Sequence, residues 1–293
     1  TPPMKKRRLT RIQLILLVLL AILVLVRMIT GPPPPDGLVV MVGLDPFDVQ
    51  HAAFEVTQPT RAAIQAVGSF EDEGTDALAA YGWILRRDTR NVVWQQQAAA
   101  SKEGQGLSAH TGDTLLFEPG TYDVYFAGYG NRYASENERR RAKWRRDADQ
   151  WQFVINPLEE MASAQLARDQ RSTAAIQSLP GLFWTTAPMR SRKEESHLFE
   201  VKQPAQVQVY AIGEVGDEVA DVAWIEDVAN RERVWTFSED NTEAAGGIER
   251  NRKFDGTLSL APGTYRVVSQ SDHDHAFGDW HGNPPFDPAG WGV

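Results

Sequence analysis

Apolar and polar residues alternate along much of residues 38–293, with the two-residue period that is typical of half-buried β-strands. Val207, Val209 and Ala211 are separated by single residues that face the other side of such a strand, and Leu258 and Leu260 repeat the pattern. Pro-Gly pairs at two places each precede a β-rich Thr-Tyr stretch, which predicts type II turns. The pattern predicts a mainly β body.

One segment has a different pattern, because Leu14–Val26 is an uninterrupted apolar run. With its flanks, Ile12–Ile29 comprises 18 residues, and at 1.5 Å per residue a helix of this length is about 27 Å long, enough to span a bilayer core. Arg27 lies at one end, where its side chain can reach the headgroups. The run Pro32–Pro35 then ends the helix and predicts a stiff spacer.

This apolar segment could be a membrane anchor or a cleaved signal peptide, and the sequence favours the anchor. A signal peptide needs a small-x-small cleavage pattern after its apolar core, whereas Arg27, Met28, Ile29 and Thr30 stand there. The basic residues that precede the segment predict a cytoplasmic N-terminus, with the body outside the bacterial inner membrane. These residues are Lys5, Lys6, Arg7, Arg8 and Arg11.

The body contains an internal duplication. The stretch from Phe54 to Pro59 reads FEVTQP, and FEVKQP recurs 145 residues later from Phe199 to Pro204. Further pairs of blocks follow in the same order, which indicates two copies of one β-sandwich. They are Trp83-Ile84 with Trp224-Ile225, Val93-Trp94 with Val234-Trp235, and Leu115–Tyr122 with Leu258–Tyr265.

The predicted fold is mainly β: two tandem β-sandwich domains joined by a helical connector and preceded by one transmembrane helix. Strong helix formers dominate 134–148 and the segment that begins at Pro157, so we expect helices there. The matched tryptophans are expected in the sandwich cores. The predicted parts are a cytoplasmic tail (1–11), the transmembrane helix (12–30), a spacer (31–37), the first sandwich (38–156, with a basic helical insertion at 134–148), a helical linker (157–180) and the second sandwich (181–293).

The duplicated unit resembles a known group of bacterial extracytoplasmic modules. Its FEV-x-QP opening, W-I strand and PGTY turn are similar to those of pre-peptidase C-terminal-type domains, which are small accessory sandwiches of the jelly-roll type. The resemblance implies an accessory or binding role without catalysis. The segment Trp280–Trp291 and the predicted anchor are departures from that family.

Composition narrows the class of protein further. The chain has no cysteine, which excludes disulfide scaffolds, thiol catalysis and cysteine-based metal sites. The formal charge is −9. Residues 1–30 hold six basic residues and no acidic one, so the remainder of the chain carries −15. An acidic body argues against nucleic acid as the partner.

The sequence contains no motif that names a reaction, such as GxSxG, HExxH or a phosphate-binding loop. We therefore predict no enzyme activity, no catalytic residue and no cofactor. The segment Asp272–Asp279 alternates aspartate and histidine, which could supply metal ligands, but its spacing matches no known metal loop. A polar loop that contains Asx turns is the preferred interpretation, so no metal site is predicted.

The candidate functional surface is a basic patch within the predicted helical insertion. It could be a docking surface for an acidic partner or for lipid headgroups, or a solvated helix face whose charges are balanced within the domain. Its residues are Arg139, Arg140, Arg141, Lys143, Trp144, Arg145 and Arg146.

The function that these features predict is a single-pass, non-enzymatic accessory subunit. Its extracytoplasmic sandwiches would brace a larger membrane protein complex, such as a bacterial photosystem or another bioenergetic complex. Its partners would be the other subunits and, through the N-terminal helix, the lipid bilayer. The alternative is a cell-surface module that binds carbohydrate or peptide through the Trp280–Trp291 segment. A sensor role is disfavoured because only about eleven residues precede the membrane segment, too few for a signalling domain.

Overall fold

The structure is a computed structural model, and it confirms that the body is mainly β. Residues 37–293 form one compact unit. The structure describes residues 37–44, 47–71, 74, 76–97, 107–129, 147–158, 164–165, 176, 179, 181–216 and 221–293.

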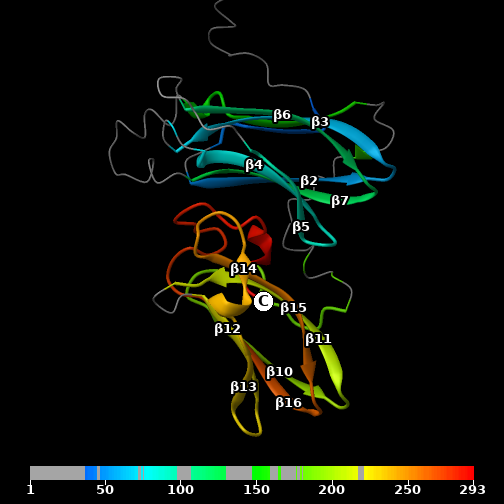
Figure 1. The fold of residues 1–293 in the computed structure, drawn as a ribbon, viewed down its shortest axis with the longest axis vertical. Coiled ribbons are helices and arrows are strands. Elements are labelled where there is room, and N and C mark those ends of the chain that lie inside the picture. The colour runs from blue at the N-terminus through cyan, green and yellow to red at the C-terminus, as the bar shows by residue number, and fades with distance from the viewer. Residues whose placement is uncertain are drawn as a thin grey trace, which may run out of the picture. The chain divides into compact units, whose positions relative to one another are not determined.

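The first repeat is a nine-stranded antiparallel sheet in the order β1-β8-β3-β4-β7-β2-β9, with β5 paired to β4 and β6 paired to β3. It folds into two layers, because β3 pairs with β6 and β8 along most of its length and reaches β4 only at its end (Figure 1). The strands are β1 (Val39–Val42), β2 (Asp48–Val56), β3 (Thr60–Phe70), β4 (Leu78–Arg86), β5 (Asn91–Gln95), β6 (Ser108–Phe117), β7 (Gly120–Gly128), β8 (Gln152–Pro157) and β9 (Ala164–Gln165).

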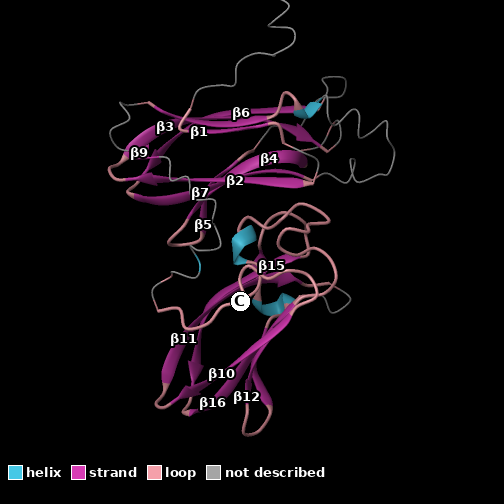
Figure 2. Cartoon of the chain, turned by 180° about the vertical axis from the view of Figure 1, so that it is seen from behind, coloured by secondary structure: helices cyan, strands magenta, loops and turns pink. Residues whose placement is uncertain are grey.

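The second repeat consists of two separate antiparallel sheets, in the orders β10-β16-β12-β13 and β11-β15-β14. Two single-turn 3₁₀ helices, η1 (Glu239–Asn241) and η2 (Pro288–Gly290), lie in its loops (Figure 2). The strands are β10 (Glu194–Val201), β11 (Ala205–Glu214), β12 (Val222–Asp227), β13 (Glu232–Thr236), β14 (Glu243–Ala244), β15 (Asn251–Leu260) and β16 (Gly263–Gln270).

The two repeats share strand order and register. The set β2-β7-β4-β5 has the same pairing as β10-β16-β12-β13, and β3-β6 has the same pairing as β11-β15. Even the register shift in the β4–β5 hairpin, after Ile84, recurs in the β12–β13 hairpin after Ile225. Matched pairs include Val56–Gly120 with Val201–Gly263, and Thr60–Phe117 with Ala205–Leu260.

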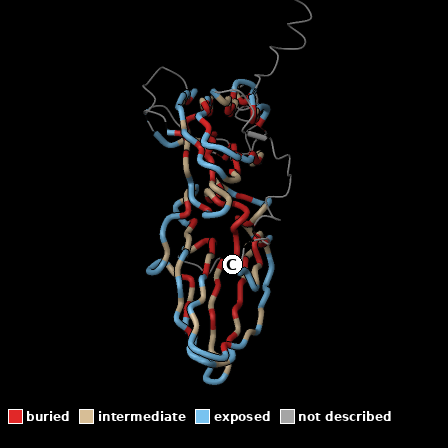
Figure 3. Tube along the Cα trace, turned by 90° about the vertical axis from the view of Figure 1, so that its right-hand side faces the viewer, coloured by how far each residue is buried: buried red, intermediate tan, exposed pale blue. Residues whose placement is uncertain are grey.

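The cores are equivalent as well. Phe54 stacks on Tyr122 at 5.2 Å between ring centroids, and Phe199 stacks on Tyr265 at 5.6 Å. Each tyrosine hydroxyl donates a hydrogen bond to the carbonyl four residues earlier. These contacts explain why the FEV and PGTY motifs recur together, since one supplies the phenylalanine and the other the tyrosine of each stack. Buried residues follow the interior of each repeat (Figure 3).

Where the predicted helical linker 157–180 is described, it is partly β-structure. Pro157 ends β8 instead of beginning a helix, and it lies opposite Ala62. A proline at the end of a strand removes no interior ladder hydrogen bond, so the residue fits this place. Residues Ala164–Gln165 form β9 on the edge of β2, where the sequence predicts helix. The rest of the linker and nearly all of 134–148 lie outside the described residues.

The predicted membrane segment 12–30 also lies outside the described residues. Among the residues that are described, no helix has the length and apolar character that a bilayer crossing requires.

Candidate functional site

An aromatic cluster lies between the two repeats. From the first repeat, Tyr81 and Trp83 on β4 and Tyr125 on β7 contribute side chains, and Trp83 stacks on Tyr125 at 5.3 Å between centroids. From the second repeat, Trp280 and Trp291 contribute, and their rings meet edge to face at 5.0 Å. The matched tryptophans are expected in two separate cores, and this is confirmed for Trp94 and Trp235, which lie inside the repeats. Trp83 lies between the repeats instead, and Trp224 is only half-buried, with the Arg233 guanidinium over its ring.

A buried ion pair crosses the same interface. Arg90 of the first repeat donates hydrogen bonds from Nε and Nη2 to the carboxylate of Asp287 in the second repeat, the former at 2.9 Å. The Tyr210 hydroxyl donates to the same carboxylate at 2.8 Å. Arg90 and Asp287 are both more than nine-tenths buried. The Trp83 indole donates a further hydrogen bond across the interface, to the Phe286 carbonyl at 2.6 Å.

The charge network continues into the first repeat through Asp123 on β7. Its carboxylate accepts hydrogen bonds from Arg87 at 2.7 and 3.1 Å and lies 2.8 Å from Nε2 of His51. Arg90 lies 3.6 Å from the other carboxylate oxygen, so Arg90 contacts both aspartates. The network balances two guanidinium groups against two carboxylates, as buried charges require.

Local backbone structure sets these side chains in place. Arg90 ends the turn between β4 and β5 with a left-handed φ of 55°, and Arg231 has a φ of 59° at the matched place in the second repeat. Asp287 precedes η2, where its carboxylate accepts the Gly290 amide and thereby fixes the direction of the side chain. Asx-type capping of this kind positions a carboxylate without needing long-range contacts.

Electrostatics favour the charged forms of Arg90 and Asp123. Burial alone would lower the pKa of Arg90, but the charge and the hydrogen bond of Asp287, together with smaller contributions from Tyr125 and Tyr210, outweigh burial and raise this pKa. Burial alone would raise the pKa of Asp123, but hydrogen bonds from His51 and Arg87 outweigh it and lower this pKa to about 2. Burial also raises the pKa of the Tyr125 and Tyr210 phenols. Both phenols therefore remain neutral in the physiological range, and the Tyr210 hydroxyl donates to Asp287.

The Asp272–Asp279 segment is used mainly for structure. His275 is buried with its ring edge to face against Trp280 and Trp291, and Nε2 lies 2.9 Å from the Asn251 carboxamide oxygen. Burial lowers the pKa of His275 to about 4, which keeps the ring neutral. Asp272, His273 and Asp274 place one potential ligand atom each within 4.8 Å of one another; His273 is exposed, and the two aspartates are half-buried. Asp272 also forms an Asx turn, as expected for a polar loop, because its carboxylate accepts the Asp274 amide at 3.0 Å.

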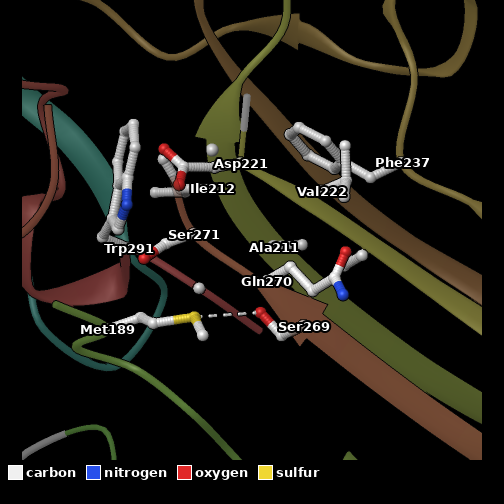
Figure 4. A pocket seen from close by; sticks show the side chains of 13 residues that line it. Met189, Ala211, Ile212, Asp221, Val222, Phe237, Ser269, Gln270, Ser271 and Trp291 are labelled. Atoms are coloured by element: carbon white, nitrogen blue, oxygen red, sulfur yellow. Dashed lines mark hydrogen bonds between the residues drawn. The ribbon is translucent and has the colours of Figure 1, made fainter. Parts of the chain in front are cut away.

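A second acidic group lies next to this segment. The Asp221 carboxylate borders a cavity of about 10 Å³, together with Ile212, Ser271 and Trp291 (Figure 4). One carboxylate oxygen accepts the Asp272 amide at 3.1 Å, and the other is buried without a hydrogen-bond partner among the described residues. Burial raises the pKa of Asp221 to about 8. The cavity is too small for more than about one water molecule, so it is not a substrate pocket.

A larger cavity of about 360 Å³ lies at the open side of the second repeat. Its floor is formed by core residues of both sheets, including Val209, Ile225 and Val267. Phe183 and Trp184 border it on one side and the edge of β11 on the other. No residue motif predicts this cavity, because its walls come from segments that lie far apart along the chain.

The basic patch of Arg139–Arg141, Lys143, Trp144, Arg145 and Arg146 lies outside the described residues. Sequence reasoning missed the network of Arg90, Asp123 and Asp287, since these residues lie far apart along the chain and in no common motif. The one signal concerns Asp123, which is the only charged residue in strand β7. A scan against family models finds no match to the chain, and a search of curated proteins finds no similar one.

Proposed function

We propose that the chain is a non-enzymatic accessory subunit of a membrane complex, anchored by residues 12–30, whose double β-repeat acts as a rigid brace outside the membrane. The anchor and the orientation rest on the apolar run and on the basic residues before it. A photosystem or another bioenergetic complex of the bacterial inner membrane is the kind of assembly that such a brace would serve.

The observation that carries the proposal is the interface between the repeats. Independent modules on a flexible tether do not need a buried aromatic cluster and a buried ion pair between them. Trp83, Trp291 and the Arg90–Asp287 pair supply both kinds of contact, since the two tryptophans are completely buried. Contacts of this kind favour one relative orientation of the repeats, and a fixed orientation is what a brace requires.

Carbohydrate binding through the Trp280–Trp291 segment has less support. Sugar-binding tryptophans present an open face to the ligand, whereas Trp280 is 6% exposed and Trp291 is completely buried. These rings pack against each other and against His275 instead.

Gentle detergent extraction followed by native mass spectrometry tests the proposal. A complex that contains the chain and other membrane subunits in fixed ratio is expected. Recovery of the chain alone, across several mild detergents, would overturn the proposed role.

The basic patch gives a variant that tests how the brace attaches. Changing Arg140, Arg141, Arg145 and Arg146 to glutamine should reduce recovery of the partners, and added salt should do the same to the unchanged chain. The matched control changes four exposed cations elsewhere: Arg61, Arg190, Lys193 and Lys202. Equal recovery of partners with both variants at every salt concentration would show that the patch is a solvated surface.

A further inference from the structure

The first repeat meets the second through the outer side of its sheet β2-β7-β4-β5, which we call the first face. Two adjacent residues of one loop are held there: the Trp83 indole donates to the Phe286 carbonyl, and Arg90 donates to the Asp287 carboxylate. Trp83 lies on β4, and Arg90 ends the turn that follows this strand. The first face therefore binds a loop through a main-chain carbonyl and, one residue later, a carboxylate.

The second repeat carries the same two donors at matched positions. Trp224 is the equivalent of Trp83 and Arg231 is the equivalent of Arg90, with the same spacing along the chain. The β4–β5 and β12–β13 hairpins that hold them share a register shift at the same place (Figure 1). The two arginines also share a left-handed backbone, with φ of 55° and 59°. The donors of the second repeat therefore have the same backbone placement as those of the first.

These donors are not used within the second repeat. Among the described residues, none accepts a hydrogen bond from the Trp224 indole, and none forms an ion pair with the exposed Arg231. Arg233 lies over the Trp224 ring, 4.2 Å from its centroid. Arg266 on β16 differs from Arg231, because it pairs with Glu226 at 3.1 Å. Arg231 is thus a cation that has the backbone placement of Arg90 and lacks an anion.

The outer side of the sheet β10-β16-β12-β13, which we call the second face, is also accessible where the first face is covered. Ala53 lies opposite Asp123 on the first face, and Leu198 lies opposite Arg266 on the second. Ala53 is 1% exposed and Leu198 is 55% exposed. The Asp123 side chain is 1% exposed and the Arg266 side chain is 43% exposed. The second face thus presents matched donors to solvent.

We propose that the second face is a docking site for an aspartate-bearing loop of a partner subunit. The Trp224 indole donates to a main-chain carbonyl of that loop, and Arg231 binds the carboxylate of the residue that follows. Tryptophan and arginine are enriched among the side chains that contribute most to protein–protein binding. The inference rests on the proposed function and deepens it, because it names a surface through which the brace would hold another subunit.

The positions of the two donors favour a polypeptide loop over a lipid headgroup. The acceptor oxygens of a phosphate surround one atom, whereas the two donors of the first face use acceptors from successive residues, Phe286 and Asp287. A second copy of the chain is disfavoured as the partner. Its own Asp287 is 3% exposed and is already paired with Arg90, so it could not offer this loop without opening its own interface.

The chain's own docking loop provides the probe. A peptide with the sequence of residues 283–290 (NPPFDPAG) is titrated into the full chain labelled with fluorotryptophan and followed by fluorine NMR, with W224F identifying the Trp224 signal. A saturable shift of the Trp224 signal is expected. The completely buried Trp83 should not shift, since its face already holds this loop. Absence of a saturable shift at Trp224 would overturn the proposal.

Two changes locate the contact. A peptide that carries the D287N change, and the chain variant R231Q, should each weaken binding at least about tenfold, because a charge-assisted hydrogen bond is lost. R61Q changes an exposed arginine on β3 and should bind as the unchanged chain does. Equal binding of the peptide to R231Q and R61Q would place it elsewhere and overturn the site. An equal shift of Trp224 by inorganic phosphate at the same concentration would overturn recognition of a loop.

Recovery of partners separates this inference from the proposed function. In the detergent extraction, R231Q should lose partner subunits that R61Q retains. Unchanged recovery with R231Q, although the peptide no longer binds, would overturn assignment of the face to a partner subunit. Failure of the peptide tests with co-purification intact would reject the docking site and leave the proposed function standing. Recovery of the unchanged chain alone would overturn both.

Discussion

At the scale of single residues, the interface depends on charges that are buried and paired. Arg90 bonds to Asp287 and also lies near Asp123, so neither carboxylate can be removed without leaving the guanidinium less well paired. The Arg86–Asp88 pair joins the same two residue types at the surface, where Asp88 is mostly exposed. Solvent screens such a pair, so its contribution is small.

Replacing Asp287 should therefore have a large effect. D287A is expected to lower the free energy of unfolding by about 3–5 kcal/mol, because a buried arginine loses its partner. The double variant R90M/D287L should recover much of this loss, since it removes both charges. Denaturant unfolding measures both effects, with D88A as the control that should change little. A loss no larger for D287A than for D88A would contradict the role of the pair.

Asp221 leads to an expectation about pH. Burial raises its pKa to about 8 in the folded chain from an ordinary value of 3.8, so the folded state holds a proton that the unfolded state has released. Its contribution to stability is complete below about pH 4 and is lost as pH rises toward 8. D221N should therefore stabilise the chain at pH 8 relative to the parent, by about 1 kcal/mol or more, and much less at pH 5. Thermal unfolding at both pH values measures this, and a difference that does not change with pH would contradict it.

At the scale of elements, the contact between β3 and β4 joins the strands of the first repeat into one sheet. A Cβ atom at Gly68 would lie 1.9 Å from the Ala80 carbonyl oxygen, so the two strands approach closely only because this residue is glycine. At the matched Gly213 the nearest atom, the Asp221 carbonyl oxygen, would be 3.1 Å away. This difference agrees with the topology: β3 pairs with β4, whereas β11 and β12 remain in separate sheets.

G68A should therefore destabilise the first repeat. We expect a loss of about 1–3 kcal/mol, because the strands must separate to accommodate the methyl group. Gly112 on β6 is the matched control, since nothing lies within 4 Å of a Cβ placed there. Chemical denaturation of G68A and G112A measures the difference. A G68A variant as stable as G112A would show that the close approach is not required.

The strands of each repeat were predictable from the sequence, whereas the interface between the repeats was not. The FEV and PGTY motifs identify strands whose partners are close in sequence, and the Phe54–Tyr122 stack explains why both motifs recur. The interface joins Trp83 to Phe286 and Arg90 to Asp287, about two hundred residues apart, through loops without a regular pattern. The helix predicted from propensity at Pro157 and at Ala164–Gln165 is wrong. These residues pair instead with the edges of neighbouring strands, and such tertiary pairing overrides local propensity.

At the scale of the whole molecule, a brace requires the two repeats to act as one rigid body. The chain has no cysteine, so a label can be placed at any chosen pair of positions without removing a native thiol. Thr114 on β6 and Lys202 after β10 are exposed, and neither belongs to the interface.

The most direct test is the distance distribution between spin labels at T114C and K202C in the full chain, measured by pulsed electron paramagnetic resonance. A rigid brace predicts one narrow distribution, which should broaden in D287A because the interface is weakened. A broad or multiple distribution in the labelled chain that otherwise keeps its native sequence would contradict the central claim that the repeats form a rigid unit.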